Sequence, residues 1–268
     1  MVKHSNSKNW FEIIKQKEYL YIIRERLDEI DPRFYTFYIN SFVIEGSHSA
    51  LLIDTGSGLF PIKPIISDLI LDKKLIVINT HSHFDHIGGN HEFNEVLIHK
   101  KERNEISKPH DISFFKNSSK EMAKLYEKLN YTLPPTNNIH SIKDGFTLDL
   151  GELSVKIIHT PGHSAGSICL LTSRNEFFSG DSAHYGTMYL YKKNFSIMLS
   201  NLSKLLDLFQ ETKIEIYPSH EEFAVGKELL IDLSKGIKNI DNIWDTKVRD
   251  EFLEAWILND EIFKYVIF

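Results

Sequence analysis

The 268-residue sequence predicts an α/β fold, and two observations support this prediction. Short apolar runs rich in β-branched residues alternate with segments whose apolar residues recur at helical spacing. The alternation occurs in two similar runs, 35–98 and 145–234, and in both of them polar residues follow the apolar strands. Because α/β proteins place their ligand sites at the ends of strands, we expect the functional site there.

Composition and charge are those of an ordinary globular protein. Of the residues, 42% are hydrophobic and 25% are charged, which suffices for a large core, and the length suits a single α/β domain over 10–268. The polar residues 1–9 are expected to be flexible. A formal net charge of -6 argues against nucleic acid as a partner.

Cysteine usage and hydropathy suggest a cellular location. Cys169 is the only cysteine, so no disulfide can form within the chain. The N-terminus has no apolar stretch typical of a signal peptide, and no apolar run reaches the ~18 residues of a membrane span. We therefore expect a cytoplasmic protein that does not enter a membrane.

The first run begins with strands and then alternates. Strands are expected at 19–23, 35–45, 50–53, 75–79 and 96–98, and residues 42–53 form a hairpin around Gly46-Ser47. Pro61 and Pro64 open a helix, whose apolar stripe consists of Ile62, Ile65, Ile66, Leu69 and Ile70.

Residues 99–140 differ in character from both runs. They are rich in lysine, lack strand signals and carry apolar residues at helical spacing, namely Met122, Leu125, Tyr126 and Leu129. We expect a helical insertion over the sheet. It is either a solvated helix pair without a role or a cap that shapes a substrate pocket.

The second run repeats the strand pattern. Strands are expected at 153–159, 168–171, 176–178 and 214–217, and helices at 198–209, 224–234 and 241–257. The apolar tail 263–268 is expected to form a closing strand that packs inside the chain.

The loop from Thr80 to Gly89 carries the strongest chemical signal. It places His81, His83, Asp85 and His86 within six residues, directly after a buried strand. Imidazole and carboxylate together suit zinc, iron and similar divalent metals. Gly88 and Gly89 follow, and we expect them to allow a sharp turn of the backbone.

Three more candidate ligands lie where predicted strands end: His163, Asp181 and His220. With the loop they make seven, whereas a single zinc takes four ligands. Seven protein ligands suit two metals, each with three ligands of its own and one that is shared.

These strings together resemble a known family. His81-x-His83-x-Asp85-His86 with Gly88-Gly89, then Pro-Gly-His163, Gly-Asp181 and Pro-Ser-His220, is similar to the metallo-β-lactamase-fold hydrolases over residues 35–225. The resemblance implies a four-layer αβ/βα sandwich with a dinuclear centre. It implies that His81, His83 and His163 bind the first metal, that Asp85, His86 and His220 bind the second, and that Asp181 bridges them. Asp54 matches the family's aspartate that orients a ligand histidine.

The resemblance also implies a reaction. Two divalent ions, zinc first, with iron or manganese accepting the same ligands, would share a hydroxide that cleaves a small ester, thioester or lactone. Asp85 and Asp181 would take part in catalysis, and His184 or Tyr185 could hydrogen-bond an oxyanion. The same centre would also suit a phosphodiesterase or nuclease, or an iron-dependent oxidoreductase.

Within the family, the glyoxalase-II-type thioesterases and the acyl-homoserine-lactone lactonases are the most similar branches. The acidic segment 241–261 argues against glutathione, and His184 stands where lactonases often have tyrosine. A small-molecule substrate is expected, and the oligomeric state, a homodimer included, stays open.

Overall fold

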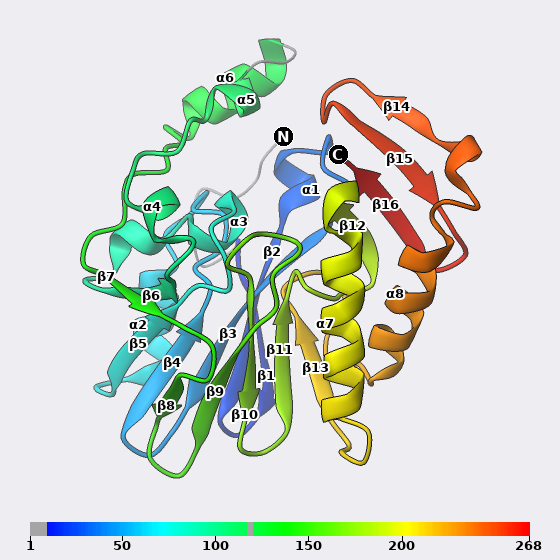
Figure 1. The fold of residues 1–268 in the computed structure, drawn as a ribbon. Coiled ribbons are helices and arrows are strands. Elements are labelled where there is room, and N and C mark those ends of the chain that lie inside the picture. The colour runs from blue at the N-terminus through cyan, green and yellow to red at the C-terminus, as the bar shows by residue number, and fades with distance from the viewer. Residues whose placement is uncertain (1–9, 117–119) are drawn as a thin grey trace. The chain divides into compact units, whose positions relative to one another are not determined.

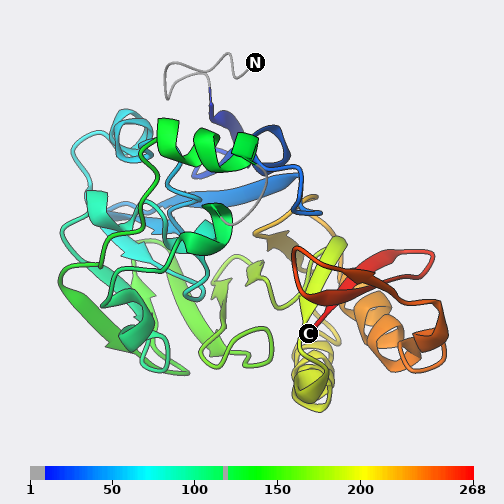
Figure 2. The ribbon, with the colours of Figure 1, turned by 90° about the horizontal axis from the view of Figure 1, so that it is seen from above.

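The computed structural model describes residues 10–116 and 120–268 (Figures 1 and 2). The expected flexibility of 1–9 therefore lies outside the described residues. The described chain is α/β, as predicted, and its strands form three sheets. It divides into two compact units. The N-terminal unit consists of the residues up to 143 together with 148–154, and the C-terminal unit consists of 144–147 together with 155–268. The single domain over 10–268 stays a prediction.

The N-terminal unit contains a seven-stranded sheet in the order β1 to β7. Neighbouring strands are antiparallel from β1 to β4 and parallel from β4 to β7. The predicted hairpin is confirmed, because Phe42 of β3 pairs with Ile53 of β4. The strands are β1 (Glu12–Lys17), β2 (Leu20–Arg26), β3 (Tyr38–Glu45), β4 (Ser49–Ile53), β5 (Lys74–Ile78), β6 (Val96–His99) and β7 (Ile139–Ile142).

The core of this unit forms between the sheet and its helices. Helix α2 (Lys63–Ile70) has Pro64 in its first turn, as predicted, and buries Ile65, Ile66 and Ile70. The short helix α1 (Leu27–Ile30) connects β2 to the loop before β3, and its first residue, Leu27, is buried in the same core.

The segment 99–140 contains helices, as predicted, but it ends in a strand. Its helices are α4 (Arg103–Ile106), α5 (Ser113–Lys116) and α6 (Lys120–Lys128), and β7 then pairs with β6 in parallel. Phe115 and Tyr126 are buried in the core of the unit, and Leu125 and Leu129 pack against it. The reading of a solvated helix pair is therefore wrong, while the side chain of Met122 lies outside the described residues.

The other two sheets lie mainly in the C-terminal unit. The larger has the order β13-β11-β10-β9-β8, and the smaller has the order β12-β16-β15-β14. Helices α7 (Phe195–Leu208) and α8 (Glu228–Asn239) contribute Met198, Leu202, Leu205, Leu229, Leu230, Leu233 and Ile237 to its core. The larger sheet consists of β8 (Thr147–Asp149), β9 (Ser154–His159), β10 (Ile168–Thr172), β11 (Glu176–Gly180) and β13 (Glu215–Pro218).

The prediction of a helix over 241–257 is wrong. The chain instead forms a 3₁₀ turn (Trp244–Thr246) and strands β14 (Val248–Asp250) and β15 (Ala255–Asn259). The closing strand is confirmed as β16 (Phe263–Ile267), which pairs with β15 on one side and with β12 (Gly186–Leu190) on the other. Pairing of β14 with β15 and of β15 with β16 thus overrides the helical spacing. None of the helices in the described residues has the length and apolar character needed to cross a membrane.

Candidate metal centre

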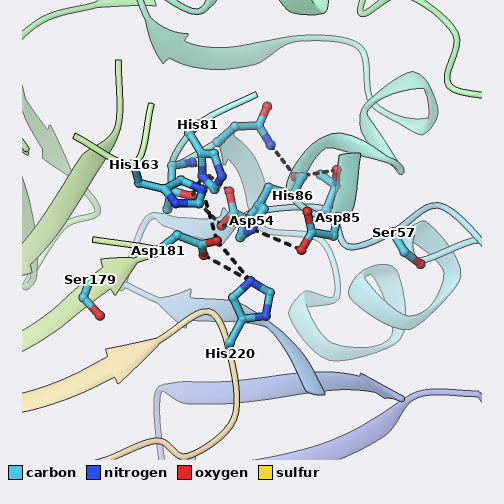
Figure 3. A network of polar contacts seen from close by, with 12 residues as sticks. Asp54, Ser57, His81, Asp85, His86, His163, Ser179, Asp181 and His220 are labelled. Atoms are coloured by element: carbon cyan, nitrogen blue, oxygen red, sulfur yellow. Dashed lines mark hydrogen bonds and ion pairs between the residues drawn. The ribbon is translucent and has the colours of Figure 1, made fainter. Parts of the chain in front are cut away.

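The four predicted ligands of the histidine loop lie together in the N-terminal unit, and Figure 3 shows His81, Asp85 and His86 among them. The chain leaves β5, extends through His83 and turns into the short helix α3 (Phe84–Ile87). The ring centroid of His81 lies 4.5 Å from that of His83 and 4.1 Å from that of His86. His86 Nε2 lies 3.5 Å from Asp85 Oδ2. The imidazoles of His81 and His86 are completely buried.

Asp54 fixes the orientation of His86. It follows β4 in a left-handed backbone conformation with φ 60°, which aspartate tolerates better than most residues. Its Oδ2 accepts hydrogen bonds from His86 Nδ1 and Thr80 Oγ1, both at 2.8 Å, and its Oδ1 accepts one from Thr80 N at 2.7 Å. The Nδ1 proton of His86 therefore points to Asp54, and Nε2 keeps the lone pair that a metal would use.

Gly88 serves close packing rather than the predicted sharp turn. Its backbone is α-helical, with φ -57° and ψ -36°, which any residue can adopt. A Cβ at Gly88 would overlap the backbone of Ser57 and Gly58, so only glycine allows the loop after β4 to lie against α3. The expected reason for this glycine was therefore wrong.

The other three predicted ligands lie together in the C-terminal unit, on the loops that follow β9, β11 and β13. His163 Nε2 lies 3.4 Å from Asp181 Oδ2, and His220 Nε2 lies 3.2 Å from each oxygen of Asp181 (Figure 3). All three side chains are buried. A carboxylate whose two oxygens both face imidazole nitrogens has the placement that a bridging ligand requires.

The loop that carries His163 is held by residues that the sequence did not single out. His163 Nδ1 lies 3.2 Å from the carbonyl of Tyr189, which leaves Nε2 for a ligand role. On α7 and just before it, Asn194 and Asn201 donate to the carbonyls of Gly162 and Pro161. The seven-residue spacing of the two asparagines, which puts them on one helix face, is the only signal in the sequence.

His184 and Tyr185, both predicted to contact an oxyanion, take different positions. The ring of His184 lies 5.1 Å from that of His220, and its Nδ1 is 2.7 Å from the carbonyl of Tyr185. The hydroxyl of Tyr185 instead donates to Asp232 at 3.3 Å, and its ring stacks on Phe263. His184 is thus the one of the two that lies beside a predicted ligand.

The loop between β9 and β10 also spells Gly162-x-Ser164-x-Gly166, the pattern of a serine-hydrolase nucleophile elbow. Such an elbow joins a strand to a helix, whereas this loop joins two antiparallel strands. Ser164 Oγ lies 2.8 Å from Ser167 Oγ in a turn of the loop. The pattern therefore lacks the structural context of a nucleophile.

The donor set fits divalent metal ions. All seven predicted ligands offer an imidazole nitrogen or a carboxylate oxygen that could hold an ion. In both units the Nδ1 atoms of ligand histidines are held by protein oxygens, which is typical of metal-binding histidines. Cys169 lies apart from this set, since its thiol contacts the carbonyl of Ser179, and burial raises its pKa to about 11.

Comparison with known proteins gives a consistent picture. The family model of the metallo-beta-lactamase superfamily matches residues 35–220. The chain is 26% identical to the acyl-coenzyme A thioesterase MBLAC2 of Homo sapiens, over 84% of this chain and 86% of that protein. It is 28% identical to a hydroxyacylglutathione hydrolase of Nitrosomonas europaea, over 67% of this chain and 58% of that protein.

Solved structures show the same fold. A metallo-β-lactamase from Pontibacter korlensis aligns with a TM-score of 0.61 at 14% identity, and the match covers 85% of this chain and 99% of that one. Since the family model spans more than half of the sequence, the chain belongs to the metallo-β-lactamase superfamily.

Proposed function

We propose that this protein is a metal-dependent hydrolase of thioesters. The observation that carries the proposal is the way Asp181 gathers His163 and His220 about its two carboxylate oxygens in a buried cluster. Lone pairs of imidazole and carboxylate that converge without a packing purpose are typical of a metal site.

We propose further that the two clusters together hold two metal ions. His81, His83 and His163 would bind one ion, and Asp85, His86 and His220 the other, with Asp181 shared. Zinc suits this histidine-rich set. When bound, such ions polarise a substrate carbonyl and lower the pKa of water. Asp54 would keep His86 in the tautomer that presents Nε2.

His184 fits the role of a proton acceptor better than that of an oxyanion donor. Its Nδ1 proton is directed to the carbonyl of Tyr185, so the neutral ring presents Nε2 as an acceptor. We propose that this nitrogen accepts a hydrogen bond from water as the thioester is cleaved.

Acyl-coenzyme A thioesters are the proposed substrate class. Three kinds of relative act on thioesters, but only the match to the acyl-coenzyme A thioesterase spans most of both chains, 84% of this one and 86% of that one. The matches to an atrochrysone carboxyl ACP thioesterase and to the hydroxyacylglutathione hydrolase cover only 49% and 58% of those proteins. A match over most of both chains includes more of the loops that surround a substrate, which is why we favour this class.

The experiment is a substrate panel on one zinc-loaded preparation. An acyl-coenzyme A, a hydroxyacylglutathione, an oxygen ester, a lactone and a phosphodiester would be compared by kcat/KM, with metal content measured on the same sample. We expect about two metals per chain and the highest kcat/KM for the acyl-coenzyme A.

Two variants complete the test. Asp181→Ala should lose turnover by on the order of 10³-fold or more, since it removes a ligand of both ions. Asp241→Ala, which removes an exposed carboxylate bonded to Lys192, should keep it. A protein that holds two metals and cleaves only the phosphodiester would refute the thioesterase assignment.

A further inference from the structure

The loop between β4 and α2, residues 54–58, determines where α3 lies. Thr55 N donates to the carbonyl of His86 at 2.8 Å, and Gly88 N donates to the carbonyl of Gly56 at 2.8 Å. Asp54 binds the His86 ring in addition. The two predicted ligands on α3, Asp85 and His86, are therefore positioned by whatever holds this loop.

Glu25 of β2 holds the loop from one side. Its Oε1 accepts a hydrogen bond from Ser57 N at 3.0 Å, and its Oε2 accepts bonds from Ser57 Oγ at 2.6 Å and Trp10 Nε1 at 2.8 Å. Only 2% of Glu25 is exposed. A Cβ at Gly56 would overlap this carboxylate, so the loop is shaped around it.

Burying the carboxyl group of Glu25 at this position costs stability. Desolvation by burial raises its pKa, although the hydrogen bonds from Ser57 and Trp10 oppose the rise. A buried carboxyl group costs stability unless its oxygens are satisfied, and an apolar side chain would fill the space at lower cost. Its three hydrogen bonds, two of them to Ser57, indicate a positioning purpose.

Tyr131 holds the same residue from another direction. It follows α6, and its hydroxyl donates to the carbonyl of Ser57 at 2.9 Å. The ring is 3% exposed and contacts Phe115 of α5 at a centroid distance of 5.6 Å. Ser57 thus uses its N–H, its hydroxyl and its carbonyl to join β2 and the helical segment 99–140 to one loop.

The contact between this loop and α3 leaves little freedom. The backbone of Ser57 and Gly58 lies so close to Gly88 that a side chain fits at neither glycine. A shift of Ser57 would therefore be transmitted to α3, since packed backbone cannot absorb it.

We propose that Glu25 and Tyr131 are positioning residues that act through Ser57 on Asp85 and His86. They would tune the affinity of the metal ion held by these two ligands, and hardly that of the ion held by His81 and His83. Through Tyr131, the segment 99–140 gains a role at the centre. This inference rests on the dinuclear site of the proposed function.

The test is a Zn²⁺ titration of metal-free, full-length protein by equilibrium dialysis against a chelator buffer, which resolves the two binding steps. Glu25→Gln places an amide N–H₂ opposite the indole N–H of Trp10 and disturbs the grip on Ser57. We expect one of the two Zn²⁺ ions to bind about tenfold more weakly and the other to be unchanged. Tyr131→Phe, which removes a single hydroxyl, should show a smaller loss at the same step.

Two matched variants serve as controls. Glu176→Gln changes a buried carboxyl of β11 that is bonded to Thr172, and Tyr126→Phe removes a buried hydroxyl bonded to Asp31 at 2.7 Å. Both should retain the two wild-type affinities, even if thermal unfolding shows that they are less stable.

The outcomes separate this inference from the proposed function. A wild-type chain that binds fewer than two Zn²⁺ ions refutes the dinuclear centre and this inference with it. The positioning role alone is refuted if the wild-type chain binds two Zn²⁺ ions but the variants Glu25→Gln and Tyr131→Phe behave otherwise than expected. That is the case if they lose affinity for both ions equally, lose affinity for neither, or bind Zn²⁺ as their control variants do.

Discussion

Replacing Asp54 by asparagine exchanges one carboxylate oxygen for an amide nitrogen, and it should move the ring proton of His86 from Nδ1 to Nε2 at the candidate metal centre. The new amide N–H₂ can occupy the place of Oδ2, which now accepts from His86 Nδ1 at 2.8 Å. An amide donates, so His86 would have to accept at Nδ1 and carry its proton on Nε2. The nitrogen needed by a metal would then be protonated.

The magnitude follows from the contacts that change. Asparagine Oδ1 still accepts from Thr80 N, and the Thr80 hydroxyl can accept from the new amide, so the contact with His86 is the one that weakens, because a hydrogen bond to a carboxylate becomes one from a neutral amide. A hydrogen bond to a charged group contributes about 1.5–3 kcal/mol and a neutral one about 0.5–1.5 kcal/mol, so we expect the free energy of unfolding of the metal-free protein to fall by about 1–1.5 kcal/mol. Zinc affinity should fall by about 10- to 100-fold, the usual effect of removing a partner that orients a ligand.

The assay combines urea unfolding of metal-free protein with equilibrium dialysis against Zn²⁺. Asp260→Asn is the matched control, because Asp260 also accepts three hydrogen bonds, from Tyr265 Oη, Ile262 N and Phe263 N, but in a turn before β16. It should lower stability and leave zinc affinity intact. If Asp54→Asn binds Zn²⁺ as tightly as the wild type, or no more weakly than Asp260→Asn, the tautomer argument fails.

Three further predictions concern the core and two buried titratable groups. Phe115→Ala should lower the free energy of unfolding by about 3–5 kcal/mol, because the buried ring lies 4.8 Å from that of Phe84; Phe114→Ala, at a ring 41% exposed, should cost clearly less in the same urea titration. Burial raises the pKa of Cys169 from 9.0 to about 11, so its thiolate fraction at pH 8 is about a hundredfold lower than in the unfolded chain. A disulfide reagent should therefore react with Cys169 about a hundredfold more slowly in buffer than in denaturant. Equal reaction rates would contradict the burial of this thiol. Burial also raises the pKa of Glu25 above 4.5, so the folded chain binds the Glu25 proton more tightly than the unfolded chain does. The free energy of unfolding of metal-free protein should therefore decline as pH rises from 4.5 through the raised pKa. Glu25→Gln should show a flatter decline, and an unchanged dependence of stability on pH would contradict the raised pKa of Glu25.

Most of the fold was predictable because its signals are local. The hairpin of β3 and β4, the proline-led helix α2 and the strands before the ligand loops all follow from alternation, turn residues and capping within a few positions. The segment 241–257 was not, since its apolar residues suit a helix face as well as a strand. Pairing of β15 with β16, which in turn lies beside β12, decided between the two.

The candidate ligands could be named from the sequence for a related reason. Each lies directly after a strand in a short polar string, so residue type and position are both visible without coordinates. What holds those ligands was not visible. Glu25 is 32 residues from Ser57, and Tyr131 is 74 residues away, and neither has a sequence context that marks it.

The sequence by itself therefore determined the superfamily, the candidate ligands and most strands, because these depend on local order along the chain. Only the tertiary structure decided that Gly88 is required for contact with Ser57, that His184 rather than Tyr185 lies beside a ligand, and that Glu25 and Tyr131 meet at one loop. Such contacts arise from close packing between segments distant in sequence, and no local pattern encodes them.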